Sequence, residues 1–124
     1  MKIEVSNGEL LDRISILELK KLKIDNPSKL ANVEMQFYKI NPLCVKLFEE
    51  NDSTLQSTYL RLAKINGILW DLENKVRDPK IKNKEFVSTS KLIFKYNMER
   101  NRIKNDINII TNSDFMDIKD YELQ

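Results

Sequence analysis

Hydrophobic residues recur at intervals of three and four along most of the chain, which is the spacing that places side chains on one face of an α-helix. Short polar breaks divide this pattern into four runs. The sequence therefore predicts helices over residues 7–24, 27–49, 53–77 and 85–110. We expect their buried faces to be formed by Leu10, Leu11, Ile14, Leu17, Leu22 and Ile24, by Leu30, Val33, Phe37, Ile40, Cys44 and Leu47, by Leu55, Tyr59, Leu62, Leu69, Leu72 and Val76, and by Phe86, Ile93, Tyr96, Ile103, Ile107 and Ile110.

Capping signals mark the starts of the first three helices. Ser6 precedes Glu9 by three residues, and Ser53 precedes Gln56 by three, so each pair has the spacing of a capping box. Pro27 follows an asparagine and is expected at the first position of the second helix, where its missing N–H costs nothing.

Three further residues predict breaks or close contacts. Pro79 ends the third helix, because the residue before a proline is pushed out of the helical region. Pro42 lies inside the second run, so we expect a kink or a break near Asn41. Gly67 costs roughly 1 kcal/mol relative to alanine in a helix interior, and we expect another helix to approach closely there.

The predicted fold is all-α, a compact bundle of four principal helices that are largely antiparallel, with the second helix kinked near Pro42. Residues 1–110 are expected to form one domain, and residues 111–124 a tail that packs partly on the bundle or on a neighbour. Residues 3–5 alternate in the manner of a short strand or an extended arm.

The composition excludes several kinds of site. The 124 residues contain no histidine, which removes Ser-His-Asp and Cys-His catalysis and imidazole metal ligands. The single Cys44 excludes an internal disulfide and is expected to be a small buried hydrophobe. We therefore expect no metal and no cofactor, and, because no signal or spanning segment is visible, a cytoplasmic protein without a membrane partner.

Polar residues interrupt the apolar faces of the last two helices. Asn66, Asn97 and Arg100 stand where a purely structural bundle would have Leu or Ile, and such groups need partners when they are buried. Two interpretations are open, a hydrogen-bonded network that fixes helix register and a polar cluster that also binds an anion. The candidate residues for this cluster or anion site are Glu9, Asp12, Arg13, Arg61, Lys64, Asn66, Asn97, Arg100 and Lys104.

A bundle of this kind can bind a dianion without histidine or metal, as the helical chorismate mutases do as a class. Such a site would use Arg13, Arg61, Lys64 and Arg100. No catalytic residue is assigned, and a non-enzymatic role is favoured, because the evenly spaced arginines of that class are missing.

Other features favour structural roles. The basic stretch 80–84, with nearby aromatic residues Phe86 and Phe94, is the basis for a weaker alternative, nucleic-acid binding, which the net charge of +2 disfavours. These aromatic residues are expected in the core. Trp70 is expected in the core or at an interface.

Four blocks of sequence carry a resemblance to a known family. They are residues 5–20, which read VSNGELLDRISILELK, residues 29–33, residues 65–73 with INxxLWDLE, and residues 96–108, which begin with Tyr96-Asn97 and include Arg100. The chain resembles a family of small all-helical bacterial and phage proteins of unknown function. The resemblance implies a link to surface polysaccharides, since members resemble products encoded beside glycosyltransferase genes.

The predicted function is therefore that of a cytoplasmic helical accessory or ligand-binding protein associated with surface-polysaccharide assembly. A homodimer is expected through apolar surface around Trp70 and the tail, and a small anionic ligand or a protein is the expected partner.

Overall fold

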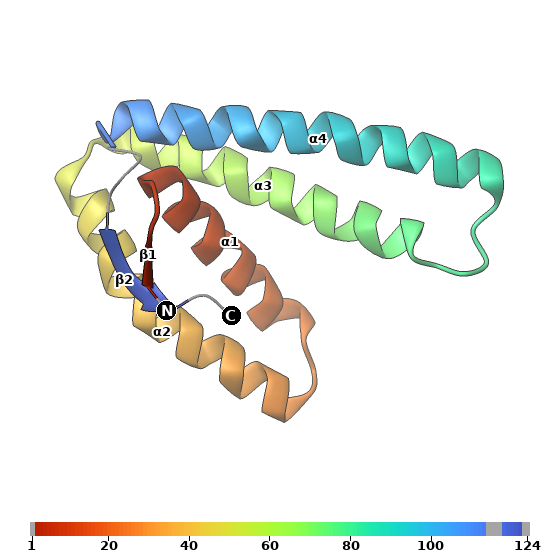
Figure 1. Cartoon of the computed structure of the whole chain (residues 1–124), viewed down its shortest axis with the longest axis horizontal. Coiled ribbons are helices and arrows are strands. Elements are labelled where there is room, and N and C mark those ends of the chain that lie inside the picture. Colours follow the sequence, from red (N-terminus) through yellow and green to blue (C-terminus); the bar gives the residue numbers. More distant parts are fainter. Residues whose placement is uncertain (1, 114–117, 123–124) are drawn as a thin grey trace.

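The computed structural model describes residues 2–113 and 118–122 and shows four helices with two short strands (Figure 1). The all-α class and the bundle of four principal helices are confirmed. Successive helices run in opposite directions, as predicted. The elements are β1 (Lys2–Glu4), α1 (Asn7–Lys23), α2 (Pro27–Glu50), α3 (Ser53–Val76), α4 (Asn83–Ile110) and β2 (Ile118–Glu122).

The helices form two hairpins that share α1. The α3–α4 hairpin is long, and its two helices make the most extensive contact in the molecule. The α1–α2 hairpin diverges from it, and α1 contacts α2, α3 and α4. Because α1 lies between the other three helices, its residues can join side chains from the whole bundle.

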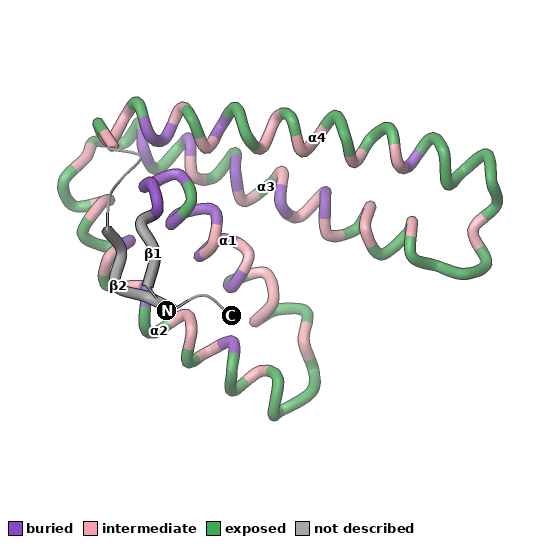
Figure 2. The backbone as a smooth tube through the Cα atoms, in the orientation of Figure 1, coloured by how far each residue is buried: buried purple, intermediate pink, exposed green. Residues whose placement is uncertain are grey.

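The core is concentrated around α1. Figure 2 shows most buried residues where α1 meets the other helices, while the distal part of the α3–α4 hairpin is mainly exposed or half-buried. The core residues are Leu10, Leu11, Ile14 and Leu17 of α1, Val33, Ile40 and Cys44 of α2, Leu55 and Leu62 of α3, and Ile103 and Ile107 of α4, together with Val5.

Helix starts follow local capping chemistry. The Glu9 amide donates to Ser6 Oγ at 3.2 Å, which confirms the first predicted capping residue. The cap of α3 is different from the prediction, because Asp52 accepts from the Thr54 amide and Ser53 is the first helical residue. The carboxylate of Asp52 therefore caps α3, although the sequence pattern predicted the hydroxyl of Ser53 as the cap.

Of the kink or break predicted near Pro42, the break does not occur. Helix α2 continues from Pro27 to Glu50, and Pro42 is on its exposed side. Only one backbone bond is lost at a proline, and the turns that flank it are anchored in the core by Ile40 and Cys44.

The prediction for Gly67 is also wrong. A Cβ built on Gly67 meets nothing within 4 Å, so no helix approaches there. The close approach is at Gly8, where a Cβ would lie only 2.3 Å from the Lys104 carbonyl oxygen. Glycine at position 8 lets the first turn of α1 rest directly on the backbone of α4.

Three residues predicted in the core are exposed. Leu22 is 82% exposed near the end of α1, and Phe86 is 46% exposed in the first turn of α4. Phe94 is exposed as well, although the aromatic residues of this helix were expected in the core. Periodicity identifies the apolar face of a helix, but it does not show where along its length a neighbour covers that face.

The two ends of the described chain meet in a small antiparallel sheet. Lys2 of β1 pairs with Glu122 of β2, and Glu4 pairs with Ile118. The strand predicted at 3–5 thus lies at 2–4, and part of the predicted tail is its partner. Residues 114–117 and 123–124 of that tail lie outside the described residues.

Candidate functional site

Asp12 is the centre of a polar network inside the bundle. Its carboxylate is buried on α1 and accepts from Arg100 on α4, whose Nε donates to Oδ1 at 3.0 Å and whose Nη2 donates to Oδ2 at 2.5 Å. A guanidinium that donates two hydrogen bonds to one carboxylate fixes both orientation and distance. The pair therefore joins α1 to α4 in one geometry.

Asn66 connects the third helix to the same carboxylate. Its Nδ2 donates to Asp12 Oδ1 at 3.0 Å and to Ser15 Oγ at 2.6 Å. The Ser15 hydroxyl in turn donates to the Asp12 backbone carbonyl at 2.8 Å. The amide that interrupts the apolar face of α3 is thus satisfied by α1, as a buried polar group requires.

Lys104 and Glu9 extend the network toward the start of α1. Lys104 Nζ lies 2.5 Å from Glu9 Oε1 and 3.9 Å from Asp12 Oδ2. The lysine side chain is only 16% exposed, whereas that of Glu9 is 53% exposed. The charge of Lys104 is therefore balanced at the rim of the bundle.

The first turn of α1 is held against α4 beside this network. The Gly8 amide donates to Asn108 Oδ1 at 2.7 Å, and the Asn7 amide donates to Ser113 Oγ at 2.9 Å. These bonds satisfy amides at the helix start that have no partner within the helix. They place Asp12, one turn further along, opposite Arg100.

The surroundings of Arg100 favour its charged form. The hydrogen bond to Asp12 raises the pKa of the Arg100 guanidinium, and partial burial offsets only part of that effect. The raised pKa of Arg100 keeps the guanidinium charged, and its two hydrogen bonds are directed to Asp12.

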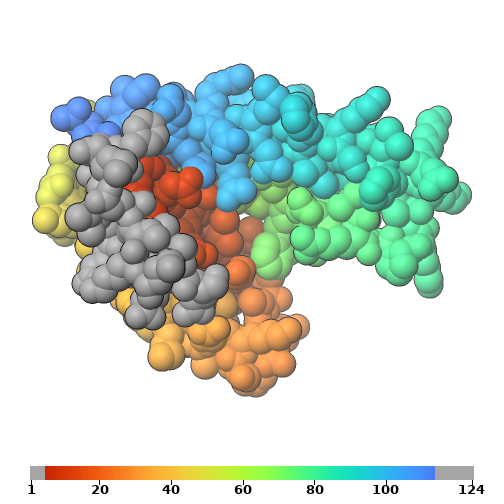
Figure 3. All heavy atoms as spheres, in the orientation of Figure 1, coloured from red at the N-terminus to blue at the C-terminus, as the bar shows by residue number. Residues whose placement is uncertain are grey.

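A cleft of about 360 Å³ opens beside the network, between α1 and the α3–α4 hairpin. Figure 3 shows the surface hollowed where α1 diverges from that hairpin. Trp70 gives the cleft an aromatic wall, and asparagine amides from two helices surround it. Its lining residues are Ile16 and Leu19 of α1, Asn66, Leu69, Trp70, Glu73 and Asn74 of α3, Arg77 at the end of α3, and Asn97 and Arg100 of α4.

Both cations of the cleft have a carboxylate partner. Arg100 is paired with Asp12, and Arg77 Nη2 lies 3.6 Å from Glu73 Oε2 one helical turn away. The lining therefore has little net charge, but it offers the accessible amides of Asn74 and Asn97, an indole ring and a guanidinium edge. Such a surface suits a ligand that is polar without being strongly charged.

The predicted site residues separate into three groups. Glu9, Asp12, Asn66, Arg100 and Lys104 come together in the network. Asn97 lines the cleft and forms the second group. The third group lies outside the lining, and it includes Arg13, which is half-buried on α1. Arg61 and Lys64 are exposed on α3 and do not line it.

Sequence reasoning missed much of the cleft wall. Trp70, Asn74 and Arg77 follow Asn66 at four, eight and eleven residues, so they lie on one face of α3. That polar and aromatic spacing was the available signal. Glu73 and Ser15 were also missed as partners of Arg77 and Asn66.

Neither a metal-ligating group of side chains nor a membrane-spanning helix is found among the described residues. Within residues 2–113 and 118–122, no three His, Cys, Asp or Glu side chains are grouped to hold a metal ion. None of the described helices is both long and apolar enough to cross a membrane.

Fold and site define a small helical protein with a partly buried ion pair at the floor of a tryptophan-walled cleft of little net charge. The chain belongs to a family of unknown function, DUF6165, whose model matches residues 1–124. No curated protein and no solved structure matches the chain.

Proposed function

We propose that this protein is a non-enzymatic ligand-binding protein and that the cleft beside Trp70 is its binding site. The observation that carries the proposal is the composition of the cleft wall, in which Trp70 stands among Asn66, Asn74 and Asn97 above an ion pair that is already neutralised. The proposed ligand is a hydroxyl-rich ring, such as the sugar unit of a glycan or of a glycan precursor.

The side chains of the wall match such a ring. An indole presents a flat apolar surface to the C–H face of a sugar, and amides both donate to and accept from hydroxyl groups. Asn74 is exposed and Asn97 half-exposed at the cleft, so both are accessible to a ligand. The volume of about 360 Å³ lies at the small end of the range for ligand sites.

The charge pattern supports a neutral ligand more than an anionic one. A dianion would need cations without partners, but Asp12 takes two hydrogen bonds from Arg100, and Arg77 is close to Glu73. The alternative of a chorismate-mutase-like site would also use Arg61 and Lys64, which lie outside the cleft lining. Nothing in the cleft favours that alternative.

The cleft also supports binding more than proton transfer. Glu73 is the carboxylate in its lining, and its Oε2 lies 3.6 Å from Arg77 Nη2. An accessory role in surface-polysaccharide assembly in the cytoplasm is the part of the proposal that rests on the family resemblance, and it agrees with a ligand of this chemistry.

Intrinsic fluorescence provides the test, because Trp70 is the only tryptophan of the chain. Titration with a panel of neutral monosaccharides and short oligosaccharides should change the emission of Trp70 saturably. Asn74→Ala should weaken that response, whereas Asn32→Ala, on the exposed surface of α2, should leave it unchanged. A panel without any saturable response, or equal loss in both variants, would overturn the proposal.

A further inference from the structure

The outer face of α4 carries an apolar stripe that no described residue covers. Val87, Phe94, Met98 and Ile109 lie on one side of the helix, and their exposed fractions are 51%, 69%, 51% and 71%. Residues of a helix turn by about 100° each, so these four fall within roughly 60° of one another. The four residues span about 33 Å along the helix, and Asn101, Arg102 and Asn105 lie on or beside the same face between Met98 and Ile109.

The spacing of this stripe is symmetric about Met98. Val87 lies eleven residues before Met98, and Ile109 lies eleven residues after it. Phe94 lies four residues before Met98, and Arg102 lies four after it. If a second copy of α4 packs antiparallel with a two-fold axis at Met98, Val87 meets Ile109, Phe94 meets the stem of Arg102, and Met98 meets itself.

Lys91 and Asp106 are opposite charges that the same antiparallel arrangement brings together, while Lys95 comes to face Arg102 of the other copy. Lys91 lies seven residues before Met98 on one side of the stripe, and Asp106 lies eight residues after it on the same side. Two-fold pairing therefore places the Lys91 of each copy beside the Asp106 of the other.

The helix ends add to this complementarity. Lys82 is the cap residue of α4 without a side-chain capping bond, and Lys84 follows in the first turn, where a cation opposes the helix dipole. The last turn of α4 has no basic residue. Antiparallel pairing brings the lysines of each copy toward the carbonyl end of the other, where a cation is favourable.

We infer that this face of α4 is a homodimer interface, formed by two copies of the chain packed antiparallel about Met98. The surface differs from the Trp70 region in which the sequence predicted the contact. Met98 and the cleft residue Arg100 point to different sides of α4, since two residues turn the helix by about 200°. Each copy of the dimer therefore keeps its cleft open, and the inference does not depend on the proposed function.

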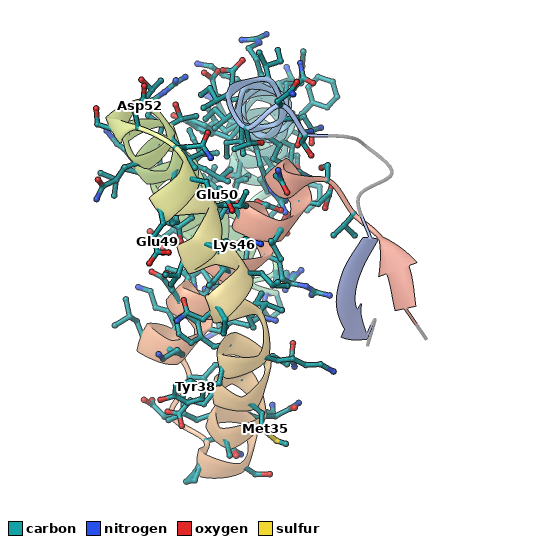
Figure 4. The ribbon with its side chains drawn as sticks, turned by 90° about the vertical axis from the view of Figure 1, so that its left-hand side faces the viewer. Met35, Tyr38, Lys46, Glu49, Glu50 and Asp52 are labelled. Atoms are coloured by element: carbon teal, nitrogen blue, oxygen red, sulfur yellow. The ribbon has the colours of Figure 1, made fainter. Side chains whose placement is uncertain are left out.

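The first test measures the mass of the full chain in solution by sedimentation equilibrium over a concentration series. The wild type should reach twice 14.7 kDa at high concentration. Met98→Glu should hold the chain at 14.7 kDa, because it places two like charges at the axis. Met35→Glu is the matched control, because Met35 on α2 is also exposed and extends into open space in Figure 4.

The second test uses disulfide formation in a Cys44→Ala background. Only a residue at the two-fold axis meets its own copy, so Met98→Cys should cross-link to a dimer on oxidation and Met35→Cys should not. Circular dichroism shows whether each variant retains its helices. A wild type that stays monomeric, dissociation by Met35→Glu as readily as by Met98→Glu, or equal cross-linking at both positions overturns the inference.

Discussion

Arg100 of α4 donates two hydrogen bonds to Asp12 of α1, a residue 88 positions away in the sequence. The carboxylate is almost fully buried, whereas the guanidinium is 27% exposed at the floor of the cleft. The interior side of the pair holds the bundle together, and its outer side shapes the proposed ligand site.

Removal of Asp12 should destabilise the protein strongly. Asp12→Ala leaves the partly buried guanidinium of Arg100 without its partner, and the loss of one member of a buried pair costs about 3 to 5 kcal/mol. Urea unfolding followed by circular dichroism measures the change.

An exposed ion pair of similar length serves as the control. Lys75 Nζ lies 2.9 Å from Glu85 Oε1, but both side chains are about half exposed. Glu85→Ala should therefore cost only about 0.2 to 1 kcal/mol. Equal losses for the two variants would mean that burial does not determine the strength of the Asp12 pair.

The two glycines should respond in opposite directions to alanine. Gly8→Ala introduces a methyl group against the backbone of α4, which should destabilise the protein by about 1 to 3 kcal/mol. Gly67→Ala meets open space in a helix interior and should stabilise it by about 0.5 to 1 kcal/mol. Thermal unfolding of both variants tests these two predictions. A higher stability of Gly8→Ala than of the wild type would contradict the close approach of α1 to α4.

Stability should fall at high pH because of Tyr59. Burial raises the pKa of the Tyr59 hydroxyl well above its usual value, and the negative charge of Glu18, to which it donates a hydrogen bond, raises it further. The unfolded chain releases this proton near pH 10, while the folded chain keeps it. The raised pKa of Tyr59 therefore adds its full contribution to the free energy of unfolding below about pH 10. Above that pH the contribution is lost, by up to about 1.4 kcal/mol per pH unit.

Tyr59→Phe is the control for this pH dependence. The variant lacks the ionisable hydroxyl, so its unfolding free energy should decline less between about pH 10 and about pH 11 than that of the wild type. Parallel declines in both proteins would assign the loss to lysines or to other tyrosines.

Much of the fold follows from local sequence, whereas the cleft does not. Periodicity and capping residues predicted the helices to within a few residues, because both depend on neighbours in the chain. Asn66 and Arg100 stood out as polar residues in apolar faces, but only tertiary structure shows that both meet Asp12.

The errors have a common physical cause. The sequence predicted packing partners for Gly67, Leu22 and Phe86, but the fold leaves open space at Gly67 and exposes the other two side chains. The same uncertainty hid the role of Trp70, since a large aromatic residue in a helix pattern fits a core as well as a cleft wall. The cleft exists because α1 diverges from the α3–α4 hairpin. The point of divergence depends on how the helices pack, and no local sequence pattern encodes it.

The central claim is that the cleft binds a hydroxyl-rich neutral ring because its cations are already paired. The most direct measurement is a titration of Trp70 fluorescence with a neutral sugar that binds and with its phosphorylated counterpart, in the wild type and in Arg77→Gln. We predict that the neutral sugar binds at least as tightly as the phosphate ester, with an affinity that does not change with added salt. Binding of the phosphate ester alone, lost in Arg77→Gln and weakened by salt, would show instead that the cleft is an anion site.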